Sequence, residues 1–120
     1  TVRKNVAPLR FMLEEATYES LVAAAFKRLV AALDRADPDA LDADNTPEMV
    51  TITAAKSGEK VVVNTQRAVR QLWVAGNGQG IHFTWDAGKG QWLDDKGKGL
   101  ELLAWVTECV FLATGERIAP

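Results

Sequence analysis

The first hydrophobic pattern in the chain has the spacing of an amphipathic helix. Between residues 17 and 36 the apolar side chains recur at intervals that place them on one helix face. They are Tyr18, Val22, Ala25, Phe26, Leu29 and Leu33. Thr17 is a favourable N-cap, and Pro38 cannot continue a helix. The pattern predicts a helix from Thr17 to about Ala36. We assign residues 1–16 to a flexible leader or non-native remnant, and 17–120 to one domain.

The middle of the chain alternates between apolar and polar positions, as half-buried strands do. In the run from Met49 to Ala54, Val50 and Ile52 share one face and two threonines share the other. The same reasoning predicts strands at 49–54, 61–63, 72–75, 81–85 and 91–93. Short turns at 56–59 and 86–90 suit hairpins, so the sheet should be antiparallel.

A second helix is predicted from about Leu100 to Ala113, with Gly115 as its C-cap. Its expected core stripe is Leu100, Leu103, Val106 and Val110. Each helix has one apolar stripe, so both can cover the same face of the sheet. The fold class is therefore α+β: a two-layer sandwich with two helices on an antiparallel sheet of about five or six strands. The expected core contains Phe26, Leu29, Val50, Ile52, Leu72, Val74, Phe83, Leu103 and Val106, with Ile118 folding back onto the sheet.

One tryptophan falls on the polar face of this sheet. Leu72 and Val74 are expected on the core face of their strand, so Trp73 and Gln71 are expected on the opposite face. His82 lies on the corresponding face of the next strand, and Asn64 ends the strand before. An aromatic side chain with polar neighbours is typical of a contact surface. For His82 alone an ordinary surface role is the commoner alternative, and Cys109 fits a buried structural thiol.

Acidic residues are concentrated between the first helix and the first predicted strand. From residue 34 to residue 48 there are six acids and one base, Arg35, so the local charge is −5. The candidate metal ligands are Asp34, Asp37, Asp39, Asp42, Asp44 and Glu48, helped by Glu19. Taken alone, such a run is usually a solvated loop. The sharper hypothesis is an edge that binds a hard cation weakly or attracts a basic partner.

Composition excludes several other classes of function. The net charge of −2 argues against general nucleic-acid binding, which needs a basic surface. The 120 residues include one cysteine, so neither an intrachain disulfide nor a cysteine-based zinc site can form. No apolar run approaches the length of a membrane span. No nucleophile–base arrangement can be defended, and we expect no enzyme.

The central third of the chain also resembles a known family. Its spelling, V-N-x-Q followed by Q-L-W-V-A, a glycine-rich turn and H-F, is similar to frataxins of the bacterial CyaY type. The matching residues are Asn64, Gln66, Gln71, Leu72, Trp73, Val74, Ala75, Gly80, His82, Phe83 and Trp92. The resemblance extends from about Tyr18 to the C-terminus, and the frataxin fold agrees with the two-layer sandwich predicted above. Frataxins usually carry several acids on the last turns of the first helix, where this chain has Ala31 and Ala32.

The resemblance implies a bacterial, cytoplasmic, iron-binding accessory protein of iron–sulfur cluster assembly. Such a protein binds Fe²⁺ or Fe³⁺ weakly, is a monomer without iron, and docks on the cysteine desulfurase–scaffold complex to modulate cluster production. The expected partner-binding residues are Asn64, Gln66, Gln71, Trp73 and His82. Two alternatives stay open: an iron donor or ferroxidase-type iron-handling protein, and a generic interaction domain that uses the Trp73 face. The sequence leaves open whether assembly is activated or inhibited.

Overall fold

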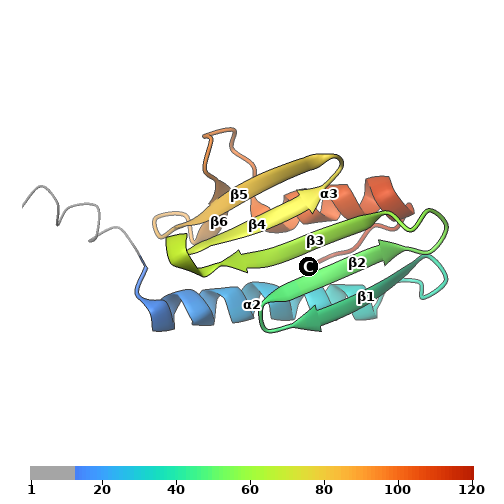
Figure 1. The fold of residues 1–120 in the computed structure, drawn as a ribbon, viewed down its shortest axis with the longest axis horizontal. Helices are drawn as coiled ribbons and strands as arrows, with labels where there is room; N and C mark the ends of the chain where they lie inside the picture. The colour runs from blue at the N-terminus through green and yellow to red at the C-terminus, as the bar shows by residue number, and fades with distance from the viewer. Residues whose placement is uncertain (1–12) are drawn as a thin grey trace, which may run out of the picture.

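The computed structural model describes residues 13–120, which form two helices and one sheet (Figure 1). The predicted leader lies mostly outside the described residues. The helices are α2, Glu15–Asp34, and α3, Leu102–Thr114, and a short 3-10 turn, η1, spans Arg67–Val69. The strands are β1 (Leu41–Thr46), β2 (Met49–Ala54), β3 (Lys60–Gln66), β4 (Gln71–Gly76), β5 (Gln79–Asp86) and β6 (Gln91–Asp94).

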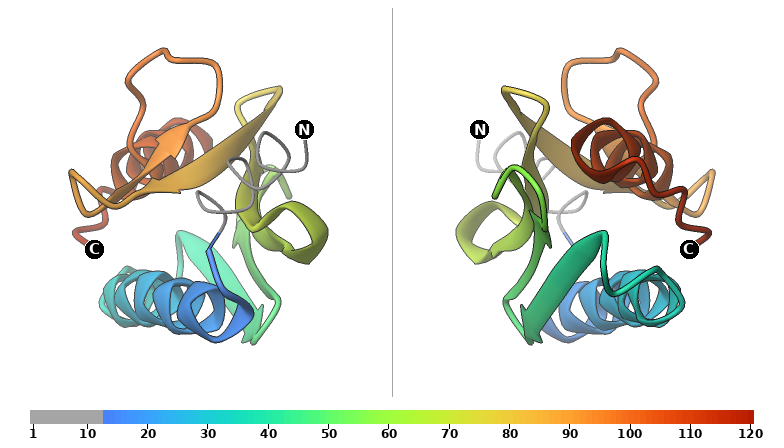
Figure 2. Two further views of the ribbon diagram at one scale, coloured as in Figure 1. Left: turned by 90° about the vertical axis from the view of Figure 1, so that its left-hand side faces the viewer. Right: turned by 90° about the vertical axis from the view of Figure 1, so that its right-hand side faces the viewer.

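The sheet follows the chain without a crossover. Its spatial order is β1-β2-β3-β4-β5-β6, and every neighbouring pair is antiparallel. Figure 2 shows both helices end-on, on the same side of the curved sheet. This arrangement confirms the predicted α+β two-layer sandwich. Neither described helix is long and apolar enough to cross a membrane.

Helix α2 begins two residues earlier than the predicted N-cap at Thr17. The backbone N–H of Tyr18 already donates to the Glu14 carbonyl over 2.8 Å, so Thr17 lies inside the first turn. Its buried stripe includes all six predicted apolar positions. The Tyr18 hydroxyl donates to the Gln71 carbonyl over 2.6 Å, and this bond fixes the start of α2 on β4. The helix ends at Asp34, before the predicted limit at Ala36.

Strand β1 was not predicted, because its sequence, LDADNT, reads as an acidic loop. Only Leu41 of this strand is buried, and the other five residues are exposed. Its pairing with β2, from Leu41 opposite Ala54 to Thr46 opposite Met49, supplies the backbone hydrogen bonds. An edge strand needs one partner and can be largely polar. The carboxylates of such a strand also discourage further edge pairing.

Helix α3 has its core stripe one position away from the prediction at its start. Leu102 is fully buried, whereas Leu103, expected in the core, is only partly buried. The Glu101 carboxylate accepts the N–H groups of Leu103 and Ala104, so the helix begins at Leu102. The stripe then runs through Leu102, Val106, Cys109 and Val110. Gly115 ends α3 as predicted, with φ at 79° and its N–H donating to the Phe111 carbonyl.

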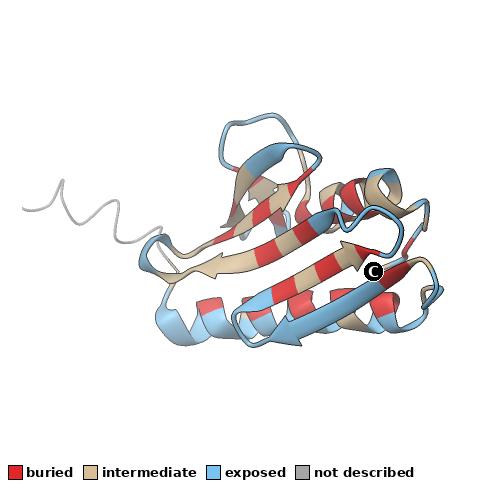
Figure 3. Cartoon of the chain, turned by 45° about the vertical axis from the view of Figure 1, so that its right-hand side comes forward, coloured by how far each residue is buried: buried red, intermediate tan, exposed pale blue. Residues whose placement is uncertain are grey.

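The core lies between the sheet and the two helices, and burial alternates along β2, β3 and β4 (Figure 3). Apart from Leu100 and Leu103, which are partly buried, every predicted core residue is buried, and so is Ile118. The C-terminal tail returns along α2, where Arg28 and Arg35 donate to the carbonyls of Pro120 and Ala119. Among residues 13–120, no helix covers the side of the sheet that faces away from α2 and α3, and we call this side the uncovered face.

Candidate functional site

The uncovered face carries a row of side chains that crosses five strands. The register pairs Thr46 with Met49, Met49 with Asn64, Asn64 with Trp73, and Trp73 with His82. All five residues lie opposite the core, because the neighbours that alternate with them along β2, β3, β4 and β5 include the buried Val50, Val63, Leu72, Val74 and Phe83. We call this set the Trp73 row.

The remaining predicted partner-binding residues form a neighbouring cross-strand pair on the same face. Gln66 of β3 pairs with Gln71 of β4, and both alternate with members of the Trp73 row along their strands. The structure therefore brings all five predicted residues together across β3, β4 and β5. None of the five is fully exposed; each is half-buried. A contact surface of this kind is largely pre-formed by the sheet.

The Trp73 indole lies across the backbone of β5, against Gly80. A Cβ atom on Gly80 would approach the Trp73 Cζ2 atom to 2.8 Å and Nε1 to 2.9 Å, which is closer than van der Waals contact allows. The ring centroid lies 6.4 Å from that of the His82 imidazole, with a tilt of 40°. Glycine at position 80 is thus what lets the large indole rest on the sheet.

Two polar atoms beside Trp73 have no hydrogen-bond partner within residues 13–120. They are Asn64 Oδ1 and His82 Nδ1, and both are buried. Buried polar atoms are nearly always hydrogen-bonded, since an unmade bond costs about 1–3 kcal/mol. The two atoms flank Trp73 in the same cross-strand row. They provide hydrogen-bonding capacity that a bound partner or water could use.

The predicted acidic ligands are distributed along one edge of the molecule. Asp42 and Asp44 alternate with Thr46 on β1, so they share the uncovered face with the Trp73 row. Asp37 and Asp39 lie at the opposite end of β1 from Thr46, where the Asp37 carboxylate accepts the N–H of Asp39 over 2.9 Å.

Glu19 and Glu48, by contrast, are bound to one arginine. Arg67 Nη1 donates to Glu19 over 2.8 Å, and its Nη2 and Nε donate to Glu48. The hydrogen bonds from Arg67, followed by the one from the Thr65 hydroxyl, hold the pKa of Glu48 below its ordinary value. The sequence did not point to Arg67, because its two partners lie 48 and 19 residues away along the chain.

These carboxylates do not form a compact metal centre. Across the described part of the chain, no three His, Cys, Asp or Glu side chains gather closely enough to hold a metal ion. Exposed oxygen donors of this kind suit hard cations with several retained waters, bound weakly. Within residues 13–120 the geometry therefore does not provide a tight metal site.

The comparison with protein-family models decides the family. The model of the frataxin-like domain matches residues 11–116. The chain belongs to the frataxin-like family. The match covers both helices and all six strands, so it includes the Trp73 row and the acidic edge of this frataxin-like chain.

Curated relatives and a solved structure agree with that assignment. The chain is 30% identical to the "Iron-sulfur cluster assembly protein CyaY" of Tolumonas auensis over 106 residues, covering 88% of this chain and 97% of the relative. It is 37% identical to the protein of the same name from Stutzerimonas stutzeri, covering 80% and 87%. The fold of the frataxin from Psychromonas ingrahamii superposes with a TM-score of 0.77 at 21% identity, covering 88% and 96%.

Proposed function

We propose that this protein is an iron-binding accessory factor of iron–sulfur cluster assembly. In this proposal it docks its uncovered sheet face on a cysteine desulfurase–scaffold complex and modulates cluster production, without being an enzyme itself. The name of its relatives supports the process, iron–sulfur cluster assembly. The observation that carries the docking step is the Trp73 row, an aromatic side chain held among polar groups on a sheet face that neither described helix covers.

The chemistry of the Trp73 row suits a protein–protein interface. Tryptophan is enriched in binding hot spots, where polar neighbours exclude water around it. Here Asn64 and His82 flank the indole, and Gln66 and Gln71 extend the polar rim. The exposed Met49 adds an adaptable apolar contact at the other end of the row. The rigid sheet limits the entropy lost on docking.

The acidic edge supports both the encounter with a basic partner and the weak binding of iron. Asp42 and Asp44 face the same side as Trp73, so their field acts where the partner approaches. Asp34, Asp37, Asp39, Glu48 and Glu19 are the remaining proposed iron ligands. Arg67 competes with iron for the last two of these.

The decisive experiment measures binding to a purified desulfurase–scaffold complex. Trp73→Ala should weaken binding by about 2 kcal/mol or more, because it removes the aromatic anchor. Leu112→Ala is the matched control, since Leu112 is 52% exposed on α3, in the helix layer. The control should bind like the parent. Equal binding by Trp73→Ala and the parent, with both folded, would remove the docking proposal.

An iron-donor or ferroxidase role receives less support from the structure. Iron oxidation needs a site that holds the metal in a defined position, and no three carboxylates of the described residues gather. Titration with Fe(II), with and without the desulfurase, separates the two roles. Iron turnover by the protein alone would favour the iron-handling alternative, whereas an effect seen only with the complex favours the accessory role.

A further inference from the structure

The short turn between β3 and β4 carries an exposed apolar side chain. Val69, the last residue of η1, is 53% exposed. The other large hydrophobic side chains exposed within residues 13–120 are Met49 of the Trp73 row and Leu112 of α3. A single exposed apolar residue needs no functional explanation by itself, so the surroundings of Val69 decide its meaning.

The η1 turn continues the candidate docking surface. Gln66 and Gln71, which flank the turn in the sequence, are paired across β3 and β4 and belong to the predicted partner-binding residues. Figure 2 shows η1 projecting from the sheet on the side that faces away from α2 and α3. Val69 is two residues before Gln71, a span of at most about 7 Å. A partner that covers the Gln66–Gln71 pair therefore reaches the turn as well.

The turn ends in a backbone conformation that residues other than glycine seldom adopt. Arg70 has φ at 54° and ψ at 45°, in the left-handed region. The other described non-glycine residue with a positive φ is Asn77, and asparagine tolerates this region more easily. Such a conformation costs free energy and persists only where the surrounding structure fixes it, and it is concentrated at functional sites and ligand clamps.

Several contacts fix Arg70 in this conformation. Its backbone N–H and its Nη1 both donate to the Arg67 carbonyl, over 3.1 and 2.6 Å. Its guanidinium carbon lies 5.9 Å from the centre of the Tyr18 ring, within the range of a cation–π contact. The Tyr18 hydroxyl donates to the carbonyl of the next residue, Gln71. The turn is thus closed on itself and tied to α2.

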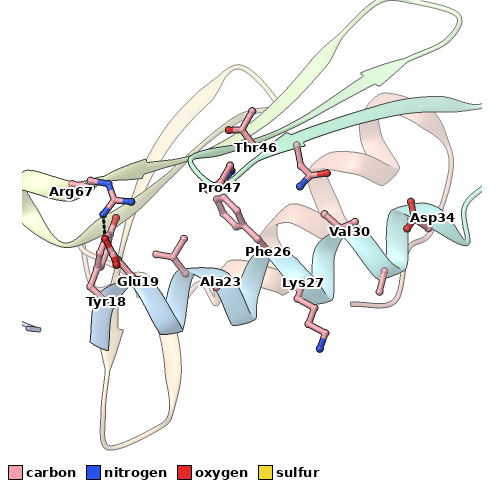
Figure 4. A pocket seen from close by; sticks show the side chains of 13 residues that line it. Tyr18, Glu19, Ala23, Phe26, Lys27, Val30, Asp34, Thr46, Pro47 and Arg67 are labelled. Carbon is pink, nitrogen blue, oxygen red and sulfur yellow. Dashed lines mark hydrogen bonds and ion pairs between the residues drawn. The ribbon is translucent and has the colours of Figure 1, made fainter. Parts of the chain in front are cut away.

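Arg67 ties the other end of the turn to the domain. Its side chain lines a groove of about 690 Å³ between α2 and the β1–β2 hairpin. Figure 4 shows its ion pair with Glu19 of α2, and it also binds Glu48 of the β1–β2 turn. Both arginines of the turn therefore bind groups of the domain itself, whereas Ala68 and Val69 between them are exposed.

We infer that Val69 is a second apolar contact of the docking surface and that Arg70 is the residue that positions it. The inference rests on the proposed docking function, so the occupant is the same desulfurase–scaffold complex. That complex must present an apolar patch to the η1 turn while its basic groups meet the acidic edge. Because the turn is already held in place, little conformational entropy is lost when it is covered.

Binding of variants to the purified desulfurase–scaffold complex tests the contact. Val69→Ala should weaken binding by about fivefold to tenfold, since it withdraws two carbon atoms from the interface. Leu112→Ala is the control of matched exposure, at 52% on the helix layer, and should bind like the parent. Trp73→Ala is measured alongside, because its effect reports the proposed docking itself. An amide NMR spectrum of each variant verifies its fold.

Arg70→Gly tests the positioning role. Glycine adopts the left-handed conformation without steric cost, so the backbone can keep its course while the guanidinium contacts are lost. We expect lower NMR order parameters for the amides of Ala68 and Val69. We also expect Val69→Ala to weaken binding less in this background than in the parent, because a mobile turn presents Val69 poorly. Unchanged order parameters together with no coupling would show that Arg70 does not position Val69.

The outcomes separate this inference from the docking proposal. If Trp73→Ala weakened binding and Val69→Ala did not, the contact at η1 would be overturned and the docking proposal would stand. If neither variant weakened binding, the docking proposal would fall together with the contact. Equal weakening by Val69→Ala and Leu112→Ala would also overturn the contact, since it would show no preference for the uncovered face.

Discussion

At the scale of single residues, glycine determines the shape of the candidate docking surface. Trp73 can lie against β5 because Gly80 has no Cβ atom in the space that the indole occupies. The ring in turn lies beside Asn64 and His82, whose side-chain atoms Oδ1 and Nδ1 are buried without partners within residues 13–120. The absence of a side chain at Gly80 thus determines the position of the Trp73 ring on the sheet.

Gly80→Ala should displace the Trp73 ring while leaving the fold intact. The new methyl would meet Cζ2 at 2.8 Å, and the indole can rotate away more easily than the backbone can move. We expect a shift of the Trp73 indole N–H resonance and weaker binding to the desulfurase–scaffold complex. Gly88→Ala, in the β5–β6 turn, is the control. An unchanged indole resonance would show that the ring does not depend on Gly80.

Asp94 is a second residue with a large local role. It is buried, and its carboxylate accepts the N–H groups of Lys96, Lys98 and Leu100 at 3.2, 2.9 and 2.8 Å. These bonds organise the loop between β6 and α3. Because they favour the charged carboxylate, with the bond from Lys98 contributing most, the pKa of Asp94 lies below its ordinary value.

The stability of the protein should therefore depend on the charge of Asp94. A carboxyl group with a lowered pKa in the folded state contributes stability above its unfolded pKa, and this is lost as the pH falls through the folded value. The loss belongs to the range below about pH 4. Urea unfolding measures the free energy of unfolding at pH 6 and at pH 3. Between these two values it should decrease less for Asp94→Asn than for the parent. Asp95→Asn leaves the three bonds in place and serves as the comparison. An equal decrease in the free energy of unfolding for Asp94→Asn and the parent would contradict this role of Asp94.

At the scale of elements, a close approach between the layers joins β4 to α3. A Cβ atom on Gly76 would lie 3.0 Å from both Cβ and Sγ of Cys109 and 3.3 Å from a methyl of Val61. Cys109 is 1% exposed, so the helix has no room to yield without repacking. The thiol is here a small packing group at a helix–sheet contact.

Gly76→Ala should destabilise the fold by about 1–3 kcal/mol, the usual cost of overpacking a core. Chemical denaturation measures this change. Cys109→Ala removes Sγ, so the Gly76→Ala change should cost less in that background than in the parent. A double-mutant cycle with no coupling between the two positions would mean that the strand, and not α3, resists the added methyl.

At the scale of the whole molecule, charge and aromatic contact share one face. Asp42 and Asp44 on β1 face the same side as Trp73 on β4, although 29 residues separate Asp44 from Trp73 in the sequence. The net charge is only −2, so the negative field comes from this local concentration. Helices cover the other side of the sheet. In the proposed docking, one face therefore supplies both the steering charges and the aromatic contact.

Replacing Asp42 and Asp44 together by Asn should slow association with the desulfurase–scaffold complex by about threefold to tenfold at low salt. The dissociation rate should change little, because the residues steer the partner and do not anchor it. Stopped-flow kinetics at several salt concentrations measures both rates. Glu15→Gln combined with Glu108→Gln, on α2 and α3, carries the matched loss of two charges on the helix layer. Equal slowing by both variants would show a general charge effect without steering.

Most of the architecture was predictable because it rests on local periodicity. The alternation of Val50 and Ile52, or of Leu72 and Val74, fixes which side of each strand is apolar, and burial then selects the core face. The same alternation turned Trp73, His82 and Asn64 to the other face. Helix α2 was predictable from its stripe, since one apolar face needs one covering surface.

The predictions failed where a segment depends on contacts from distant parts of the chain. Strand β1 was missed because one buried residue, Leu41, gives no alternation, and pairing with β2 makes it a strand. Leu103 was wrongly placed in the core because Leu102, four residues before Val106, takes the buried position in the first turn of α3.

Except for β1, the sequence by itself determined the layer to which each helix and strand belongs, and the face that carries Trp73, because side-chain periods of 2 and 3.6 are properties of neighbouring residues. Only the tertiary structure decided which separate residues meet. It joined Arg67 to Glu19 and Glu48, laid Trp73 on Gly80, and opened the groove beside α2. Those contacts depend on strand register and on the distance between helix and sheet, which no local pattern encodes.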